Sequence, residues 1–336
     1  MNINSKTLLI TGIDNFIGLR AAELALERGM KVRGLQTSGN RKNTNNLDID
    51  LLFGNITDFA IAQKLCQAVD IVFHTEQLAA ETGDIKKFRE INVGGTMNIA
   101  KAAKDAGVKI FVHLSSVLVY GFNYPHQVTE SELLCGENNP YCQTKIEAES
   151  ALLQLNAPPD FNIIIIRAGD VYGPGCIPWV VRPLLLMRQN LFAYANDGKG
   201  VSNHLYIDNL IDAIFLAVEK EPSGEISGEI FNITDGQETS WKEYFTKLAA
   251  IENLPAFISL PKDEMKLLLQ VRYQGQKLLR KKADILPESL DFITRPYAYS
   301  IAKAKTMLGY QPKVDLTEGM RRTHEWLKKT DIQKLI

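Results

Sequence analysis

A short apolar run, two glycines and a helical pattern follow one another at the start of this chain and constrain its fold most strongly. Residues 6–18 read KTLLITGIDNFIG, and the helical pattern that follows them stops at Gly29. This order predicts a strand, a glycine-containing turn and a helix, which is the context that gives a glycine fingerprint its meaning. The N–H groups of such a turn and the positive end of the helix can bind a pyrophosphate. The alternative is an ordinary strand–turn–helix with two turn glycines.

The spacing of the turn departs from the usual three glycines, because Asn15 stands where the middle one is expected. Asparagine tolerates left-handed backbone better than most residues, but its side chain occupies space. Gly18, at the start of the helix, can serve close packing against the strand. The candidate dinucleotide contacts of this turn are Gly12, Asn15, Phe16, Ile17 and Gly18.

Composition excludes several classes of protein. The formal net charge is −1 and 45% of the residues are hydrophobic, so we expect an ordinary globular protein with no nucleic-acid partner. The four cysteines form no C-x-x-C pair or metal-like cluster, which predicts a reduced, cytoplasmic protein without a metal site. We expect neither a signal peptide nor a membrane partner, because the N-terminus is polar and no apolar run is long enough to span a bilayer.

Strand-like and helix-like segments alternate along the first 235 residues. This alternation predicts an α/β fold, a Rossmann-type doubly wound parallel sheet, and the segment 88–106 is expected to be one of its helices. From residue 236 on, amphipathic helical pieces dominate. We therefore expect a dinucleotide-binding domain of residues 1–175 plus about 201–235, and a smaller, mainly helical C-terminal substrate lobe of about 176–200 plus 236–336.

The end of the second strand bears on the choice of cofactor. An acidic residue there would hold the adenosine 2′-hydroxyl of NAD, whereas basic residues would accept the 2′-phosphate of NADP. The sequence has Gln36 and Thr37 at this point and then Arg41 and Lys42, with no carboxylate. We count Gln36, Thr37 and Arg41 as cofactor contacts and favour NADP over NAD; the alternative is that the two cations belong to a solvated loop.

A tyrosine and a lysine four residues apart, Tyr141 and Lys145, lie on one face of a predicted helix. A nearby ammonium favours phenolate and lowers the tyrosine pKa, so the phenol can exchange a proton with a hydroxyl or carbonyl during hydride transfer. Ser116, at the end of a strand, can hold the same oxygen. The pattern also occurs at 273/277 and 299/303, which we interpret as solvated helix faces away from the strand ends.

Together these residues resemble an extended short-chain dehydrogenase/reductase of the NAD-dependent epimerase/dehydratase type. The resemblance covers nearly the whole chain, through 11–18 (TGxxGxxG), 54–58 (GDxxD), 92–96 (NVxGT), 114–121 (SSxxVYG), 167–175 (RPGxVYGPG) and 300–312 (KAxxxLGYxP). It implies catalytic roles for Ser116, Tyr141 and Lys145, with Asn92 supporting a proton relay. It also implies cofactor contacts from the following residues: Asn55, Ile56, His74, Thr75, Tyr141, Lys145, Gly169 and Val171.

Other side chains near these segments stay open to two interpretations. Glu76 stands where the family has the first alanine of H-x-A-A; it is either a substrate-pocket acid or, as we expect, a rim residue facing water. His74 and His113 are expected to be core histidines, and His204 either reaches the substrate cleft or packs in a strand. The resemblance also implies a homodimer, with Ile99, Ala102, Ala103, Ala148, Ala151 and Leu152 as its outer helix faces; the alternative is that these faces cover the sheet.

Ser202 occupies the position where nucleotide-sugar enzymes of the family carry a diphosphate-binding arginine. This argues against a nucleotide-sugar substrate. Residues 231–236 and the C-terminal lobe are more similar to the 3β-hydroxysteroid dehydrogenase and dihydroflavonol reductase branches. We expect an NAD(P)-dependent oxidoreductase that interconverts a secondary alcohol and a ketone on a small apolar or ring-bearing substrate. Its pocket would draw on Trp179, Phe192, Tyr194 and 184–187, unless these form the core of the lobe. The alternatives are a nucleotide-sugar epimerase or dehydratase, and a non-catalytic cofactor-binding protein.

Overall fold

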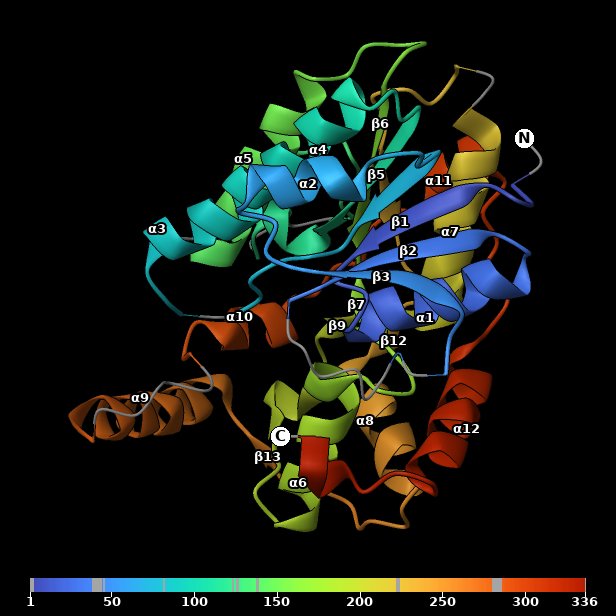
Figure 1. Cartoon of the computed structure of the whole chain (residues 1–336). Helices are drawn as coiled ribbons and strands as arrows, with labels where there is room; N and C mark the ends of the chain where they lie inside the picture. Colours follow the sequence, from blue (N-terminus) through green and yellow to red (C-terminus); the bar gives the residue numbers. More distant parts are fainter. Residues whose placement is uncertain are drawn as a thin grey trace.

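A seven-stranded parallel sheet forms the centre of the molecule (Figure 1), in a computed structural model that describes residues 3–37, 44, 46–80, 82–122, 124, 127–136, 139–221, 224–279 and 286–335. The strand order is β11-β6-β5-β4-β1-β2-β3. These strands are β1 (Thr7–Thr11), β2 (Lys31–Gln36), β3 (Ile49–Phe53), β4 (Ile71–His74), β5 (Ile110–Ser116), β6 (Asn162–Ala168) and β11 (Ile230–Ile233). The chain reverses its direction of travel across the sheet after β3, so β1 and β4 lie side by side at a topological switch point.

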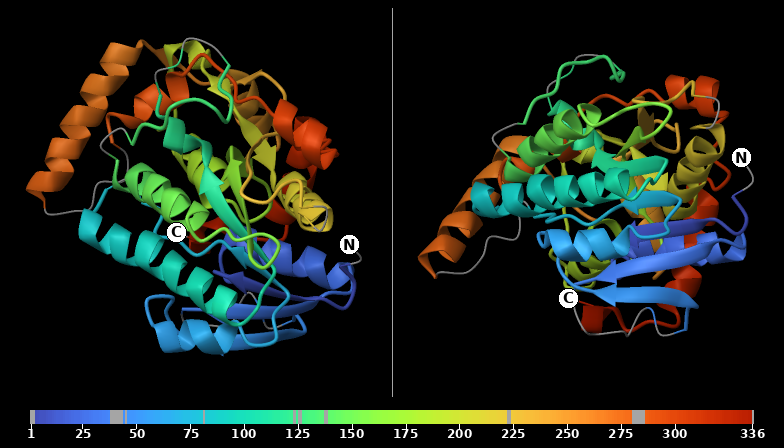
Figure 2. Two further views of the ribbon diagram at one scale, coloured as in Figure 1. Left: turned by 90° about the horizontal axis from the view of Figure 1, so that it is seen from above. Right: turned by 45° about the horizontal axis from the view of Figure 1, so that its top comes forward.

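Helices cover both faces of the sheet, as Figure 2 shows. One apolar core forms under α1 (Phe16–Glu27) and α7 (Ile207–Lys220), and a second forms under α2 (Phe59–Leu65), α4 (Thr96–Asp105) and α5 (Pro140–Leu153). Successive residues of one strand serve different cores: Leu8 and Ile10 belong to the first, and Leu9 belongs to the second. This division follows from the period of two along a strand. The predicted α/β class is confirmed.

Most of the remaining elements form small sheets and helices below the central sheet in Figure 1, whereas α11 (Ala302–Leu308) lies beside α7 at the level of the sheet. Short strands pair as β7 (Asp170–Tyr172) with β10 (His204–Tyr206), β9 (Val201–Ser202) with β12 (Thr239–Ser240), and β8 (Tyr194–Ala195) with β13 (Ser259–Leu260). The other helices of this part and of the C-terminal segment are α6 (Arg182–Arg188), α8 (Trp241–Ala250), α9 (Lys262–Leu278), α10 (Ser289–Thr294) and α12 (Leu316–Leu327).

The segment expected to be one helix over 88–106 is divided. Helix α3 (Ile85–Phe88) leads into a π-helical stretch, η1 (Arg89–Gly95), before α4 begins. A Cβ atom on Gly95 would lie 2.5 Å from the Ile56 side chain, so the helix approaches the β3–α2 connection closely at this point. Wide turns of this kind often occur at functional sites, and this one contains Asn92.

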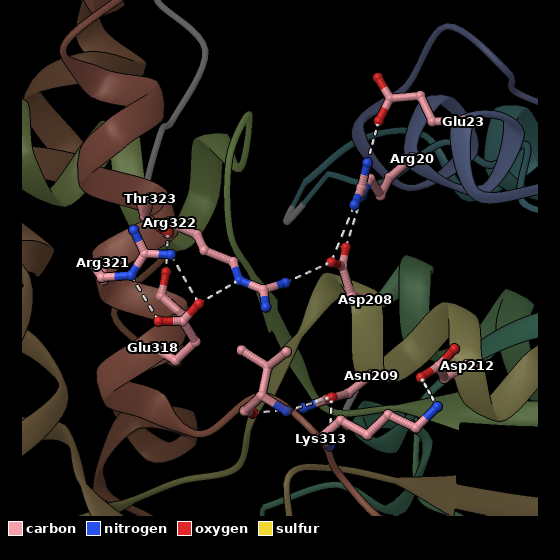
Figure 3. A network of polar contacts seen from close by, with 12 residues as sticks. Arg20, Glu23, Asp208, Asn209, Asp212, Lys313, Glu318, Arg321, Arg322 and Thr323 are labelled. Carbon is pink, nitrogen blue, oxygen red and sulfur yellow. Dashed lines mark hydrogen bonds and ion pairs between the residues drawn. The ribbon is translucent and has the colours of Figure 1, made fainter. Parts of the chain in front are cut away.

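A polar network joins three helices that are far apart in the sequence (Figure 3). Asp208 of α7 accepts two hydrogen bonds from Arg20 of α1, at 2.7 and 3.1 Å, and a third from Arg322 of α12, at 3.1 Å. Arg322 also donates to Glu318 at 2.8 Å. Because Arg20 follows Gly18 by two residues, the network ties the start of α1 to the C-terminal part of the chain.

The shared acceptor of this network provides a stability test. We expect Asp208→Asn to lower the free energy of unfolding by about 1–2 kcal/mol, between the values typical of surface pairs and of buried pairs, because both arginines lose the same carboxylate. Arg321→Gln is the control, since Arg321 pairs with Glu318 on its own helix surface. Denaturant unfolding measures both variants; equal, negligible losses would contradict this role for Asp208.

Candidate active site

The turn after β1 is built around two glycines that tolerate no side chain. Gly12 has φ of +67°, and a Cβ atom there would lie 2.5 Å from Asn15 and 2.9 Å from the Glu76 carboxylate. A Cβ atom on Gly18 would lie 2.2 Å from the Gly12 carbonyl oxygen. The two positions therefore require glycine, one for its backbone angle and both for close approach.

Asn15 has a structural reason to replace the third glycine. Its backbone is extended, and its side-chain oxygen accepts a hydrogen bond from the Gly18 N–H at 2.8 Å, so it is the N-cap of α1. Its amide nitrogen donates to the Thr75 hydroxyl at 3.0 Å. The asparagine thus fixes the turn to the end of β4. This N-cap was missed in the sequence, although an asparagine directly before a helical pattern is an N-cap signal.

The residues of this turn fit a dinucleotide pyrophosphate. The N–H groups of Phe16 and Ile17 lie in the first turn of a 12-residue helix, where no intrahelical acceptor is available to them. On the adjacent strand, Thr75 donates to the Thr11 carbonyl at 2.8 Å. His74 bonds the hydroxyls of Thr11 and Thr96, each at 2.8 Å, and burial lowers its pKa to about 3, so the ring is neutral. His74 is a core histidine, as expected.

Glu76 is half-buried and does not extend freely into water as the rim interpretation expected. Its carboxylate lies against Gly12, and its own N–H donates to the Thr11 hydroxyl at 3.3 Å. Burial and, secondarily, the nearby Asp14 raise the pKa of Glu76 to about 7. Burial also raises the pKa of Asp14. A phosphate at this turn would therefore meet two carboxyl groups as well as helix N–H groups.

The other predicted cofactor contacts lie along the same edge of the sheet. Gln36 is buried at the end of β2 and Thr37 beside it is exposed. Asn55 is exposed and accepts a hydrogen bond from the Thr57 N–H at 3.0 Å, whereas Ile56 is buried. Arg41 lies outside the described residues.

Ser116 and Tyr141 come together at the carboxyl end of β5. The Tyr141 hydroxyl donates to the Gln77 side-chain oxygen at 3.2 Å, and the nearby Ser116 hydroxyl lowers the pKa of Tyr141. Tyr141 lies in the first turn of α5, where Pro140 is the first residue and Asn139 accepts from the Tyr141 N–H at 2.9 Å. Gln77 was missed as a site residue, although it lies in the segment just after β4.

Lys145 lies one turn further along α5 and is almost fully buried. Its ammonium bonds the Leu114 carbonyl and lies 3.2 Å from Nε2 of His113. Burial lowers the pKa of Lys145 to about 7, against the opposing effect of Glu149. The expected lowering of the Tyr141 pKa is not found: burial raises it, and the hydrogen bonds to Ser116 and Gln77 lower it only in part. His113 is buried as expected, but it contacts the site.

Asn92 connects the site to its surroundings through its side-chain amide. Its oxygen accepts from the Leu78 N–H at 2.7 Å, and its nitrogen donates to the Leu78 carbonyl at 3.1 Å and to the Thr144 hydroxyl at 3.0 Å. These bonds hold the segment that carries Gln77 against α5. They are the contacts of a positioning residue; a relay through Asn92 stays a proposal.

A buried ion pair lies directly behind the serine, tyrosine and lysine. Arg167 of β6 makes a forked contact with Glu149 of α5, at 2.6 Å for the shortest pair, and both side chains are at most 3% exposed. Ser115 donates to the same carboxylate, and Arg167 donates to the Tyr120 hydroxyl at 2.7 Å. Glu149 follows Tyr141 and Lys145 at four-residue spacing on α5. That spacing was the available sequence signal for this residue, which our sequence analysis did not use.

The 167–175 loop leaves β6 through Gly169, where a Cβ atom would lie 2.4 Å from the Asn203 carbonyl oxygen. Val171 is half-buried on β7. The neighbouring Asp170 pairs with Arg295 at 2.6 Å, and that guanidinium is buried against the Phe292 ring. Ser202, on β9, is also buried.

Of two further sets of residues outside this site, the first differs from expectation, and the second, His204, packs in a strand, which was one of its two interpretations. Tyr299 is buried beside Tyr120 and lies outside α11, and Lys303 bonds the Ile230 carbonyl at 2.8 Å, so this pair is not a solvated helix face. His204 does not line the cleft: its ring is buried and bonds Asp235 at 3.0 Å and Thr239 at 2.9 Å.

The proposed pocket and dimer residues mostly serve the protein core. Leu184, Met187 and Tyr194 are buried, and Trp179 and Phe192 pack against the same core. For four of the six residues of the proposed dimer faces the alternative holds, because they are buried against the sheet in the second core: Ile99, Ala102, Ala103 and Leu152.

The parallel sheet with its glycine turn at the switch point is that of a Rossmann-type dinucleotide-binding protein. Residues 8–234 match the model of the NAD dependent epimerase/dehydratase family, and the chain belongs to that family. The resemblance seen in the sequence is thus confirmed.

Similar proteins include reductases, dehydrogenases and epimerases. The chain is 24% identical to the 4-hydroxy-2-methyl-3-oxo-4-farnesyl-3,4-dihydroquinoline-1-oxide ketoreductase of Stigmatella aurantiaca, over 93% of both chains. It is 27% identical to the decarboxylating sterol-4-alpha-carboxylate 3-dehydrogenase ERG26 of Saccharomyces cerevisiae, over 96% of this chain and 97% of the relative. The UDP-glucose 4-epimerase structure from Thermotoga maritima, solved with UDP-glucose, superposes with a TM-score of 0.76 at 22% identity, over 96% and 99% of the chains. The chain is an NAD(P)-dependent oxidoreductase of the short-chain dehydrogenase/reductase type.

The position of Glu76 predicts that dinucleotide binding depends on pH. A pyrophosphate at Gly12 disfavours the ionised carboxyl and raises its pKa further, so binding takes up a proton. Affinity is then constant below the Glu76 pKa of about 7. Above it, affinity falls by up to about ten-fold per pH unit. Fluorescence titration with NADPH across pH measures the dependence.

Two variants separate Glu76 from other titrating groups. Glu76→Gln abolishes the pH dependence near neutrality, whereas Asp14→Asn moves it to lower pH, because Asp14 contributes to the raised pKa of Glu76. An unchanged pH profile in Glu76→Gln would disprove the linkage.

The buried ion pair provides a second prediction. We expect Glu149→Gln to lower the free energy of unfolding by about 3–5 kcal/mol, because it leaves the Arg167 charge buried without its partner. Glu147→Gln, which removes the acceptor of the exposed Arg89, is the control and should change little. Thermal and denaturant unfolding measure both; a cost for Glu149→Gln no larger than for the control would refute this role.

Proposed function

We propose that the enzyme interconverts a secondary alcohol and a ketone on a small apolar or ring-bearing molecule, with Tyr141 as the acid/base. The side chains of Tyr141 and Ser116, close enough at the carboxyl end of β5 for the serine to lower the tyrosine pKa, carry this proposal. Two hydroxyls in this arrangement can both reach one substrate oxygen. Parallel sheets bind their ligands at this edge.

The protonation of the site favours ketone reduction. Burial raises the pKa of Tyr141, so the phenol is protonated at neutral pH and can donate to a carbonyl oxygen. Ser116 would hold the same oxygen by a hydrogen bond. Lys145, with a pKa lowered to about 7, can return a proton to the site and would also hold the ribose. When bound, the nicotinamide supplies the hydride.

The substrate class is proposed from what the cleft lacks and from the relatives. Ser202 offers no guanidinium for a diphosphate, and Arg295 is already paired with Asp170 under the Phe292 ring. The ketoreductase and the sterol dehydrogenase are named for apolar, ring-bearing substrates. We further propose that residues 176–200 and 236–336 form the substrate lobe.

For the cofactor we propose NADP, because Gln36 and Thr37 leave no carboxylate at the end of β2. The enzyme is proposed to act in the cytoplasm, since all four cysteines are free, and to form a homodimer, which the family resemblance implies.

A nucleotide-sugar epimerase is the second candidate, because the structural match includes such an enzyme. The two reactions differ in their net use of cofactor: ketone reduction consumes reduced cofactor, whereas an epimerase consumes none over a complete turnover. A panel of cyclic ketones with NADPH, and UDP-glucose with NAD, distinguishes them.

Tyr141→Phe tests the proposed proton transfer. We expect ketone reduction to fall by about 10²–10⁴-fold, because the acid is lost. NADPH binding, followed by fluorescence, should stay within a few-fold of the wild type. Tyr273→Phe is the matched control, since it changes the tyrosine of the Y-x-x-x-K pattern on α9. Retained reduction in Tyr141→Phe would exclude this tyrosine as the acid.

A further inference from the structure

Helix α9 is 17 residues long and has no buried residue. Both Figures 1 and 2 show it projecting from the edge of the molecule, away from the central sheet. Of the 12 large apolar side chains that are exposed among the described residues, six lie between 258 and 279. A helix without buried contacts gains little from its own chain, because helices in proteins are stabilised chiefly by packing an apolar face.

Five of these six exposed apolar residues, all except Ile258, form one stripe. Leu267, Val271 and Leu278 follow each other at spacings of four and seven, and Leu268 and Leu279 lie beside them, so the five cover about 120° of the helix surface. Their exposed fractions run from 57% for Leu268 to 84% for Leu278. This is a continuous apolar surface of the kind that marks an interaction site.

Basic residues flank the stripe. Lys266 and Lys277, eleven residues apart, fall on one side of it by helical geometry, and Arg272 falls on the other. The acidic residues of the helix, Asp263 and Glu264, are confined to its first turn. Long basic side chains beside an apolar stripe can extend to lipid phosphates while their stems stay on apolar surface.

We propose that α9 is an interfacial helix that docks the enzyme on the surface of an anionic phospholipid bilayer. An apolar face with lysine and arginine at its edges is the pattern of a helix that lies in the plane of the membrane interface. No helix in the described part of the chain is long and apolar enough to cross a bilayer, and an interfacial helix needs no such length. The earlier expectation of no membrane partner considered only spanning segments. The proposal does not depend on the reaction assigned above.

Co-sedimentation of the full chain with vesicles tests this docking. We expect binding to phosphatidylcholine vesicles that contain phosphatidylglycerol, and much weaker binding to phosphatidylcholine alone. Leu268→Glu with Val271→Glu should weaken binding at least about ten-fold, because two apolar contacts are lost and two charges are added. Gln270→Glu with Gln276→Glu adds the same charges to the same helix outside the stripe and should weaken binding less.

The remaining outcomes overturn the proposal. A wild-type protein that does not sediment with anionic vesicles excludes membrane docking. Equal losses in the two double variants would show that charge alone is responsible. A wild-type dimer in sedimentation velocity that becomes a monomer in Leu268→Glu with Val271→Glu, without vesicle binding, would assign the stripe to a second copy of the chain. Retained NADPH binding and circular dichroism show that each variant is folded.

Discussion

The buried contact between Arg167 and Glu149 is the interaction on which the geometry of the site depends. It links β6 to α5, and through Ser115 it also holds the end of β5. Ser116 is the next residue of that strand, while Tyr141 and Lys145 precede Glu149 by two turns and one turn of the same helix. Removing two charges from water is costly. The forked geometry offsets this cost, together with the hydrogen bond that Ser115 donates to Glu149 and the one that Tyr120 accepts from Arg167. The pair therefore fixes three elements together.

At the carboxyl end of β1, the phosphate turn combines groups that attract a phosphate with groups that repel it. The first turn of α1 presents N–H groups, and Asn15 replaces a glycine without opening the turn because it caps the helix and bonds Thr75. Glu76 and Asp14 bring two carboxyl groups to the same place. The turn is thus suited to a dinucleotide chiefly when Glu76 is protonated. A half-buried acid with a raised pKa beside a phosphate site makes affinity depend on pH in a way that an alanine would not.

Much of this architecture could be predicted from the sequence. The strand and helix patterns fixed the parallel sheet, and Gly12, Gly18, Ser116 and Tyr141 were identified because backbone angles and four-residue spacing are local properties. What could not be predicted depends on tertiary packing. The burial of Glu76, the contact of Lys145 with His113, and the core positions of Ile99 and Leu152 depend on which element covers each side chain. No local pattern states that.

The exposure of α9 likewise depends on tertiary packing. Periodicity predicted a helix in this region, but it did not predict that the helix would have no buried residue. The central claim is that the turn after β1 binds a dinucleotide and that Tyr141 exchanges a proton with the substrate during hydride transfer. Titration of the wild-type protein with NADPH and NADH near pH 6, followed by energy transfer from protein fluorescence, tests it most directly. The account predicts saturable binding, with NADPH bound more tightly than NADH. Failure of both to bind would contradict it, because Asn15, Asp14 and Glu76 would then have closed the phosphate turn to any dinucleotide.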